Sequence, residues 1–257
     1  MKQYIVDAFT DQVFQGNPAA VVLLEAWISD ELMNNIAKEN NLSETAYTVK
    51  TGNTYHLRWF TPGGEIDLCG HATLATAFVI STFVEPEGVD LTFETLSGTL
   101  KVHRDGSWFE LDFPAYALKR VPVTEAMRDA IGVIPVEAVL GRDLVLVVED
   151  ETTVKQLTVN QETLKTLEGL LVNVTARGTT FDCVTRSFAP KLNIAEDPVC
   201  GSGHCHVIPY WSHRTGQTEF MALQASARGG ILWCRMHGDR VLLRGQAVLF
   251  AESVLHI

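Results

Sequence analysis

Two distant stretches of the chain repeat one pattern, and this repetition constrains the fold more than any other feature. The first stretch leads from Glu65 to Cys69-Gly70-His71, and the second leads from Glu196 to Cys200-Gly201-Ser202. In each, a Glu precedes the Cys by four residues, a Gly follows it, and a mostly apolar segment comes next. We interpret the two stretches as copies of one element, with each Cys-Gly pair at the N-terminus of a helix.

The first turn of a helix can hold an anion. Its amide N–H groups lack intrahelical partners, and the macrodipole places partial positive charge there. A Gly lets the backbone approach an anion closely, and a thiol at the same place is expected to be biased toward thiolate. Two such termini facing each other across a cleft would hold a small carboxylate from both sides. The pattern therefore predicts a site for proton transfer at carbon.

The composition is that of a globular protein and argues against several function classes. The chain has 257 residues, of which 46% are hydrophobic, enough for two modest domains or one large one. Its formal net charge of −11 argues against a nucleic-acid partner and gives no reason to expect attraction to anionic membranes. The sequence contains neither an apolar leader nor an apolar run as long as a membrane span. We therefore expect a cytoplasmic protein.

The cysteines and glycines carry no metal or cofactor signature. Five cysteines without Cys-x-x-Cys spacing favour a reduced protein over a disulfide framework. Cys183 and Cys234 lie in strand-like runs and are expected in the core. His204, Cys205 and His206 are adjacent, so they would point in different directions on a helix, and no zinc site is predicted there. Because neither Gly-x-Gly-x-x-Gly nor P-loop spacing occurs, no nucleotide cofactor is predicted.

The periodicity of apolar residues predicts similar elements in both halves. Helices are expected from Ser29 to residue 41, after Cys69, from Thr124 to a stop at Gly132, over 161–167, and after Cys200. Strands are expected at 4–9, 17–24, 42–49, 55–59, 91–93, 99–103, 108–113, 136–140, 144–148, 170–175, 180–188, 228–234 and 241–250. Residues 114–122 are the expected linker, which gives domains 1–115 and 116–257, with a last strand that can cross back to the N-terminal lobe. Many strands and few helices favour an α+β fold.

Motifs along almost the whole chain resemble those of one family. They lie at 6–10, 16–21, 42–46, 60–73, 188–190 and 196–202. In this order they are similar to the phenazine-biosynthesis PhzF-like proteins, relatives of diaminopimelate epimerase and proline racemase. The resemblance implies two pseudo-symmetric lobes, each a barrel-like, mostly antiparallel sheet around a central helix. It also implies an active site between the lobes and a homodimer.

The resemblance also implies roles for individual residues. Glu44 would be the base and acid that moves a proton within a small carboxylate-bearing substrate, without a metal or an organic cofactor. His71, Asp197 and Ser202 would orient that substrate. Amides around Gly70, His71, Gly201 and Ser202 would hold its carboxylate or the charge that develops on it. Without the resemblance, Glu44 would be expected on the surface, and Asp197 and Ser202 would be expected to cap helices.

The chain departs from the PhzF-like pattern at two positions. Most of the PhzF-like proteins that this chain resembles have Thr at the position of Cys200 and Ala at the position of Gly203. The racemase and epimerase relatives have a cysteine at each of the two helix starts. Cys69 and Cys200 restore such a pair. Three hypotheses follow: an isomerase that uses Glu44, a two-thiol racemase or epimerase of an amino or imino acid that uses Cys69 and Cys200, and a non-catalytic binder of small carboxylates.

Overall fold

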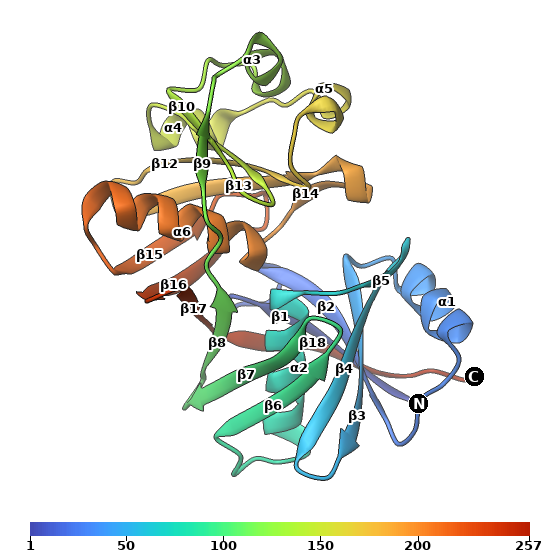
Figure 1. Ribbon diagram of the computed structural model, residues 1–257. Helices are drawn as coiled ribbons and strands as arrows, with labels where there is room; N and C mark the ends of the chain where they lie inside the picture. Colours follow the sequence, from blue (N-terminus) through green and yellow to red (C-terminus); the bar gives the residue numbers. More distant parts are fainter. The chain divides into compact units, whose positions relative to one another are not determined.

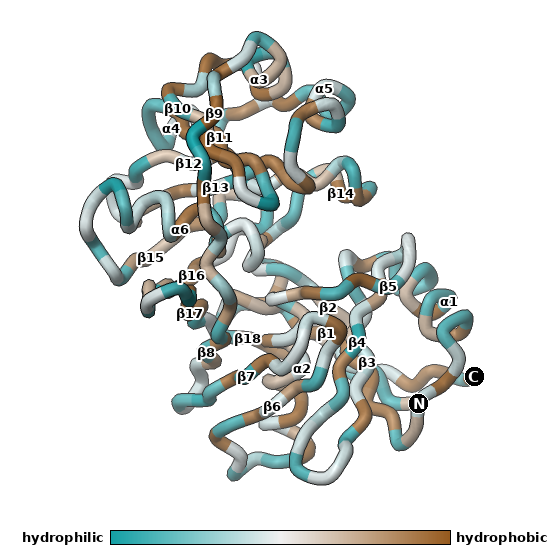
Figure 2. The backbone as a smooth tube through the Cα atoms, viewed as in Figure 1, coloured by the Kyte–Doolittle hydropathy of each residue, from teal (hydrophilic) through white to brown (hydrophobic).

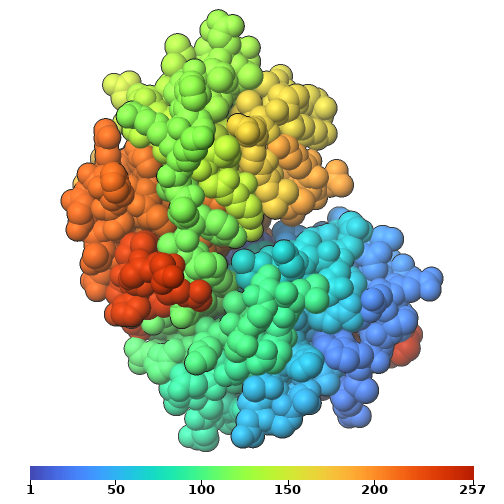
Figure 3. Space-filling model, viewed as in Figure 1, coloured from blue at the N-terminus to red at the C-terminus, as the bar shows by residue number.

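A computed structural model describes all of residues 1–257. The chain divides into two compact units, which we call unit 1 (Met1–Asp112 with Arg244–Ile257) and unit 2 (Phe113–Leu243). Both chain ends belong to unit 1, and they lie on the same side of it in Figure 1. In Figure 3 the last residues, in red, lie against the blue N-terminal part. The chain leaves unit 1 within strand β8 (Trp108–Pro114) and returns within β17 (Arg240–Gly245).

Unit 1 is a curved, mostly antiparallel sheet around helix α2 (Gly70–Phe83), as Figure 1 shows. Helix α2 has apolar side chains on all of its faces, and most of them are buried. It therefore contacts β1, β2, β3 and β18 rather than solvent. Helix α1 (Asp30–Asn40) packs its apolar face on β3 and β4. Besides β8, the strands are β1 (Lys2–Ala8), β2 (Asn17–Leu24), β3 (Glu44–Thr51), β4 (Thr54–Thr61), β5 (Gly64–Ile66), β6 (Asp90–Thr95), β7 (Gly98–Asp105) and β18 (Ala247–Val254).

Unit 2 is a second sheet with its own apolar core. Figure 2 shows a hydrophobic stretch along β11, and buried residues of β11, β12 and β13 form that core with α3, α4 and α5. The helices are α3 (Glu125–Ile131), α4 (Glu151–Gln156), α5 (Gln161–Thr166), α6 (Gly201–Thr215) and the 3₁₀ turn η1 (Pro190–Leu192). Besides β17, the strands are β9 (Lys119–Val121), β10 (Glu137–Leu140), β11 (Leu144–Val147), β12 (Val172–Arg177), β13 (Cys183–Ala189), β14 (Ile194–Asp197), β15 (Glu219–Gln224) and β16 (Gly230–His237).

The two units repeat the same strand pairings in the same order. The parallel pairs β2/β3 and β4/β6 of unit 1 correspond to β11/β12 and β13/β15 of unit 2. The antiparallel pairs β1/β2, β3/β4 and β6/β7 correspond to β10/β11, β12/β13 and β15/β16. In each unit a short strand, β5 or β14, precedes the buried helix. The predicted α+β fold with a duplicated element is confirmed.

The repeated Glu of the sequence pattern has a structural partner in each unit. Arg58 donates from Nε and Nη2 to the two carboxylate oxygens of Glu65, at 2.6 and 2.7 Å. Arg186 donates in the same way to Glu196, at 2.7 Å in both bonds. Each guanidinium also lies over the ring of a phenylalanine two residues later, Phe60 and Phe188. We call these two arrangements the arginine clamps; they hold β5 and β14 to the sheet just before α2 and α6 begin.

Local signals predicted the helix ends well. Ser29 caps α1 and Thr124 caps α3, each accepting from a backbone N–H three residues later, and Gly132 ends α3 in the left-handed conformation. The predicted linker at 114–122 contains the short strand β9, which pairs with β10 and was not predicted. A strand of three residues is too short to show alternation. No helix of the structure has the length and apolarity to cross a membrane.

The expectation of one strand over 241–250 is wrong, because β17 ends at Gly245 and β18 begins at Ala247. A side chain at Gly245 would lie 2.4 Å from the ring of Phe9, so this position admits only glycine without rearrangement. Four further elements, β5, α4, β14 and β15, were not predicted from the sequence.

Candidate active site

Both Cys-Gly pairs lie at helix N-termini, as predicted. Cys69 is the N-cap residue of α2, and Cys200 is the N-cap residue of α6. The Sγ atom of Cys200 accepts from the Gly203 N–H at 3.3 Å, whereas Cys69 makes no side-chain cap. Ser202 lies in the first turn of α6, and Asp197 is the last residue of β14.

A buried carboxylate and imidazole meet in unit 1. Glu44 is the first residue of β3, and His71 is in the first turn of α2, which packs on β2 and β3. His71 Nε2 lies 3.0 Å from Glu44 Oε2, with the side chains only 5% and 8% exposed. Neither atom has a hydrogen-bond partner. The two buried groups therefore lie in contact without a hydrogen bond between these atoms.

The other ring nitrogen of His71 has different neighbours. Nδ1 lies 3.1 Å from the amide nitrogen of Asn17 and 3.5 Å from Cys69 Sγ. Burial lowers the pKa of His71, but the neighbouring Cys69 and Glu44 raise it above its ordinary value. The ligand-type atoms of Glu44, Cys69 and His71 lie within 4.8 Å of one another. Because the ring presents a different nitrogen to each partner, the set fits a hydrogen-bonded chain better than a single metal ion.

The expectation that the helix-terminal thiols are biased toward thiolate is wrong. Burial raises the pKa of Cys69, and the Glu44 charge raises it further. Burial also raises the pKa of Cys200 well above its ordinary value, as does the charge of Asp197. The helix terminus favours a thiolate, but loss of solvation outweighs that effect for side chains that are almost fully buried.

Unit 2 has no counterpart of the carboxylate. Thr45 pairs with Phe60 in unit 1, and Val172 pairs with Phe188 in unit 2. Phe60 and Phe188 occupy equivalent positions in the two arginine clamps, so Thr45 and Val172 are equivalent too. Glu44 directly precedes Thr45 and Leu171 directly precedes Val172, so Glu44 corresponds to Leu171. Leu171 packs with Cys200 and Ala189 in a small apolar cluster. His71 corresponds to Ser202, because each is the second residue after its Cys. The two units thus share a scaffold but differ in their chemistry.

Two histidines of α6 anchor the start of that helix. His206 donates from Nδ1 to the Ser202 carbonyl at 2.9 Å and accepts the Asp143 N–H at Nε2, at 3.1 Å. His204 donates from Nδ1 to the Cys200 carbonyl at 2.8 Å, and burial lowers its pKa to about 4. Both rings are thus tied to backbone groups as neutral structural residues. The contacts that Asn17, Asp143 and His206 make around the predicted site residues were not predicted from the sequence, because they join residues that are far apart in the chain.

Gly203 lies where α6 is closest to the sheet. A Cβ atom at this position would lie 2.4 Å from Asn173 Oδ1 and 3.1 Å from Ser187 Oγ. The Ser187 hydroxyl donates to the same Asn173 oxygen at 2.7 Å, which fixes the amide. The glycine that departs from the PhzF-like pattern is therefore required by the side chain beneath it.

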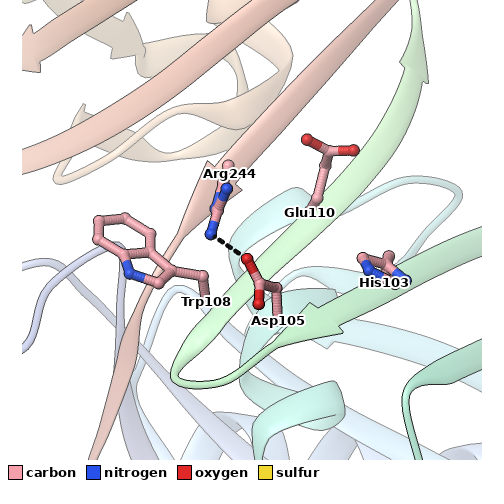
Figure 4. Close-up of a pocket in the computed structure, with 5 residues that line it drawn as sticks. All are labelled: His103, Asp105, Trp108, Glu110 and Arg244. Atoms are coloured by element: carbon pink, nitrogen blue, oxygen red, sulfur yellow. Dashed lines mark hydrogen bonds and ion pairs between the residues drawn. The ribbon is translucent and has the colours of Figure 1, made fainter.

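An open pocket of unit 1 contains none of the predicted residues. It is lined by His103, Asp105, Trp108, Glu110 and Arg244. Figure 4 shows Arg244 directed at Asp105, with a distance of 2.7 Å between Nη2 and Oδ2. The guanidinium also lies over the Trp108 ring at 5.2 Å. Since these groups already contact one another, the pocket is a weaker candidate than the buried Glu44 and His71.

Comparison with known proteins agrees with this architecture. A family model described as phenazine biosynthesis-like protein (PhzC-PhzF) matches residues 6–253. An uncharacterized isomerase of Pseudomonas aeruginosa is 45% identical over 98% of this chain and 97% of its own length. The crystal structure of a PhzF family protein from Enterococcus faecalis is 50% identical, covers 100% of this chain and 99% of its own, and has a TM-score of 0.97. A probable proline racemase from Agrobacterium radiobacter covers 100% of this chain and 93% of its own; at 11% identity its TM-score of 0.67 reports the fold alone. The chain belongs to the phenazine biosynthesis-like PhzC-PhzF family.

Proposed function

We propose that the protein is an isomerase that moves a proton within a small carboxylate-bearing metabolite without a cofactor, with Glu44 as base and acid. Membership of the family and the similar proteins that are named isomerases support the reaction class. The observation that carries the assignment is the close approach of Glu44 and His71 inside unit 1, at 3.0 Å between Oε2 and Nε2.

The geometry supports a carboxylate mechanism. A general base must lie within hydrogen-bond distance of the proton that it removes, and Glu44 has one carboxylate oxygen with no hydrogen-bond partner. His71, in the first turn of α2, lies 3.0 Å from that oxygen. The amides at the start of α2, at Gly70 and His71, are the proposed donors to the carboxylate of the substrate or to charge that develops on it. In unit 2 we propose the same part for Gly201 and Ser202, with Asp197 and Ser202 orienting polar groups of the substrate, as the resemblance implies.

The two-thiol alternative receives less support. It draws on Cys69 and Cys200 at equivalent helix starts. Burial raises the pKa of both thiols, which works against a thiolate base. Cys200 packs beside Leu171, where unit 1 has Glu44. A non-catalytic binder is the remaining alternative, since a fold alone does not guarantee activity.

Deuterium wash-in tests the proposal. The protein is incubated in heavy water with dihydro-hydroxyanthranilate, both enantiomers of proline and hydroxyproline, and diaminopimelate, and mass gain is followed on each compound. Glu44→Gln keeps the shape of the side chain and is expected to lower exchange by about 100-fold or more. Cys200→Ser is expected to leave exchange within a few-fold of wild type. Cys183→Ala, which changes a buried thiol outside the site, is the matched control.

The outcomes separate the hypotheses. Exchange that is lost in the Cys69→Ala/Cys200→Ala variant but kept in Glu44→Gln would replace the proposal with the two-thiol mechanism. Thermal stabilisation by a compound that shows no exchange would indicate a binder of that compound. We also propose a homodimer, as the resemblance implies, and light scattering on the purified protein would contradict it if the mass equals that of one chain.

A further inference from the structure

Asn17 is the residue next to the proposed acid–base pair that neither the sequence nor the family assignment gave a role. It is the first residue of β2 and is fully buried. Its amide nitrogen lies 3.1 Å from His71 Nδ1. The contact joins β2 to the first turn of α2, between residues 54 positions apart in the chain.

The surroundings of His71 determine where its proton must lie. A carboxylate can only accept a hydrogen bond when ionised, so Glu44 beside Nε2 favours a proton on that nitrogen. A neutral imidazole with its proton on Nε2 has a lone pair on Nδ1, which needs a donor. The Asn17 amide N–H supplies one, and the Cys69 thiol, 3.5 Å away, can supply a second.

We propose that Asn17 is a positioning residue for His71: its amide donates to Nδ1, so that the neutral ring carries its proton on Nε2, toward Glu44. A proton on Nδ1 would face the amide N–H, and the amide would have to turn over to accept it. The negative charge of Glu44 favours an imidazolium, and Asn17 opposes it. The Nε2 proton of His71 is thereby kept on the side of the ring that faces the Glu44 carboxylate.

The inference deepens the proposed function and rests on it for its catalytic meaning, but its test needs no substrate. Protein labelled with ¹⁵N on histidine is titrated by NMR, since ring nitrogen shifts distinguish the two neutral tautomers and the imidazolium. The chain has eight histidines, and loss of one set of signals in His71→Gln assigns the ring. We expect the neutral form of His71 to be the Nε2–H tautomer in the wild type.

Two variants of Asn17 test the hydrogen bond to His71: one removes the donor, and the other replaces it with a carboxylate. Asn17→Leu keeps the size but removes the donor, so we expect a mixture of tautomers and a higher His71 pKa. Asn17→Asp replaces the donor with an acceptor, so we expect a proton on Nδ1 and a His71 pKa raised by about one unit or more. Asn173→Asp, at a buried asparagine of unit 2, is the matched control and should leave the His71 signals unchanged.

The wild-type spectrum alone can overturn the proposal, since a neutral His71 with its proton on Nδ1 is incompatible with it. The proposal also fails if both Asn17 variants are folded, as judged by their thermal unfolding, and keep the wild-type tautomer and pKa. The Glu44 mechanism would survive either result, because deuterium wash-in tests it separately. Conversely, a protein without exchange activity can still have the tautomer that we infer.

Discussion

At the residue scale, Cys200 is better explained as a helix cap than as a catalytic thiol. Its Sγ accepts the Gly203 N–H, and burial keeps it protonated at neutral pH. We expect Cys200→Ser to retain the cap, because serine is a strong N-cap residue, and to unfold in urea at a concentration equal to or above that of the wild type. Cys200→Ala should lose about 1 kcal/mol of unfolding free energy. A Ser variant less stable than the Ala variant would contradict the cap.

His204 should make stability depend on pH. Burial holds its pKa at about 4 in the folded state, against an ordinary value of 6.5. The unfolded chain therefore takes up a proton below the ordinary value while the folded protein does not, so this contribution is complete near neutrality and is lost as pH falls toward the folded pKa. The full loss is roughly 3 kcal/mol.

His204→Asn checks this expectation. Asparagine can keep a donor near the position of Nδ1, which bonds the Cys200 carbonyl, but it does not titrate in this range. Urea unfolding at neutral and acidic pH should show a smaller loss of stability for the variant than for the wild type, with other titrating groups common to both. Equal losses in the two proteins would show that His204 does not remain neutral in the fold.

At the element scale, the arginine clamps explain why the Glu of each repeated stretch is kept four residues before the Cys. β5 and β14 are short strands of three and four residues, too short to hold their place by backbone pairing alone. The bidentate bonds from Arg58 and Arg186 attach them to the neighbouring strands β4 and β13. The position at which each buried helix begins therefore depends on an ion pair in the preceding strand.

We expect Glu196→Gln to lower the unfolding free energy by about 1–3 kcal/mol, because a charge-assisted pair with little exposure is lost. A double-mutant cycle with Arg186→Met should show coupling between the two side chains. The exposed pair of Lys165 and Glu162 is the control, since surface ion pairs contribute at most about 1 kcal/mol. Coupling no larger than that of the control would mean that the clamp does not stabilise unit 2.

At the scale of the whole molecule, local patterns in the sequence predicted the features that depend on residues close together in the chain. The caps at Ser29 and Thr124, the two Cys-Gly helix starts and the alternating strands all depend on neighbours in the chain. The sequence could not predict that Glu44 lies beside His71, because that contact depends on parallel pairing of β2 with β3 and on the packing of α2 across them. Only the family resemblance linked the two residues in advance. The contacts of Asn17 and His206 were missed for the same reason.

The last strand ties the end of the chain to its beginning. β18 pairs with β1 along its whole length, with Lys2 opposite Val254 and Ala8 opposite Ala247, and the N-terminal amine donates to the Leu255 carbonyl at 2.8 Å. A chain that ends at Gln246 would expose the edge of β1, which also pairs with β2 and contacts α2. Truncation after Gln246 should therefore lower the unfolding free energy of unit 1, while the core of unit 2 should keep its stability.

Hydrogen exchange followed by mass spectrometry checks this expectation in the chain truncated after Gln246. Amides of β1 and β2 should lose protection by about tenfold or more, because their exchange would follow a lower unfolding free energy. Amides of β12 and β13, which belong to the core of unit 2, serve as the internal control and should keep their protection. Equal loss in both units would instead mean that they unfold as one cooperative structure. In that case the pairing of β18 with β1 in unit 1 would contribute to the stability of both units.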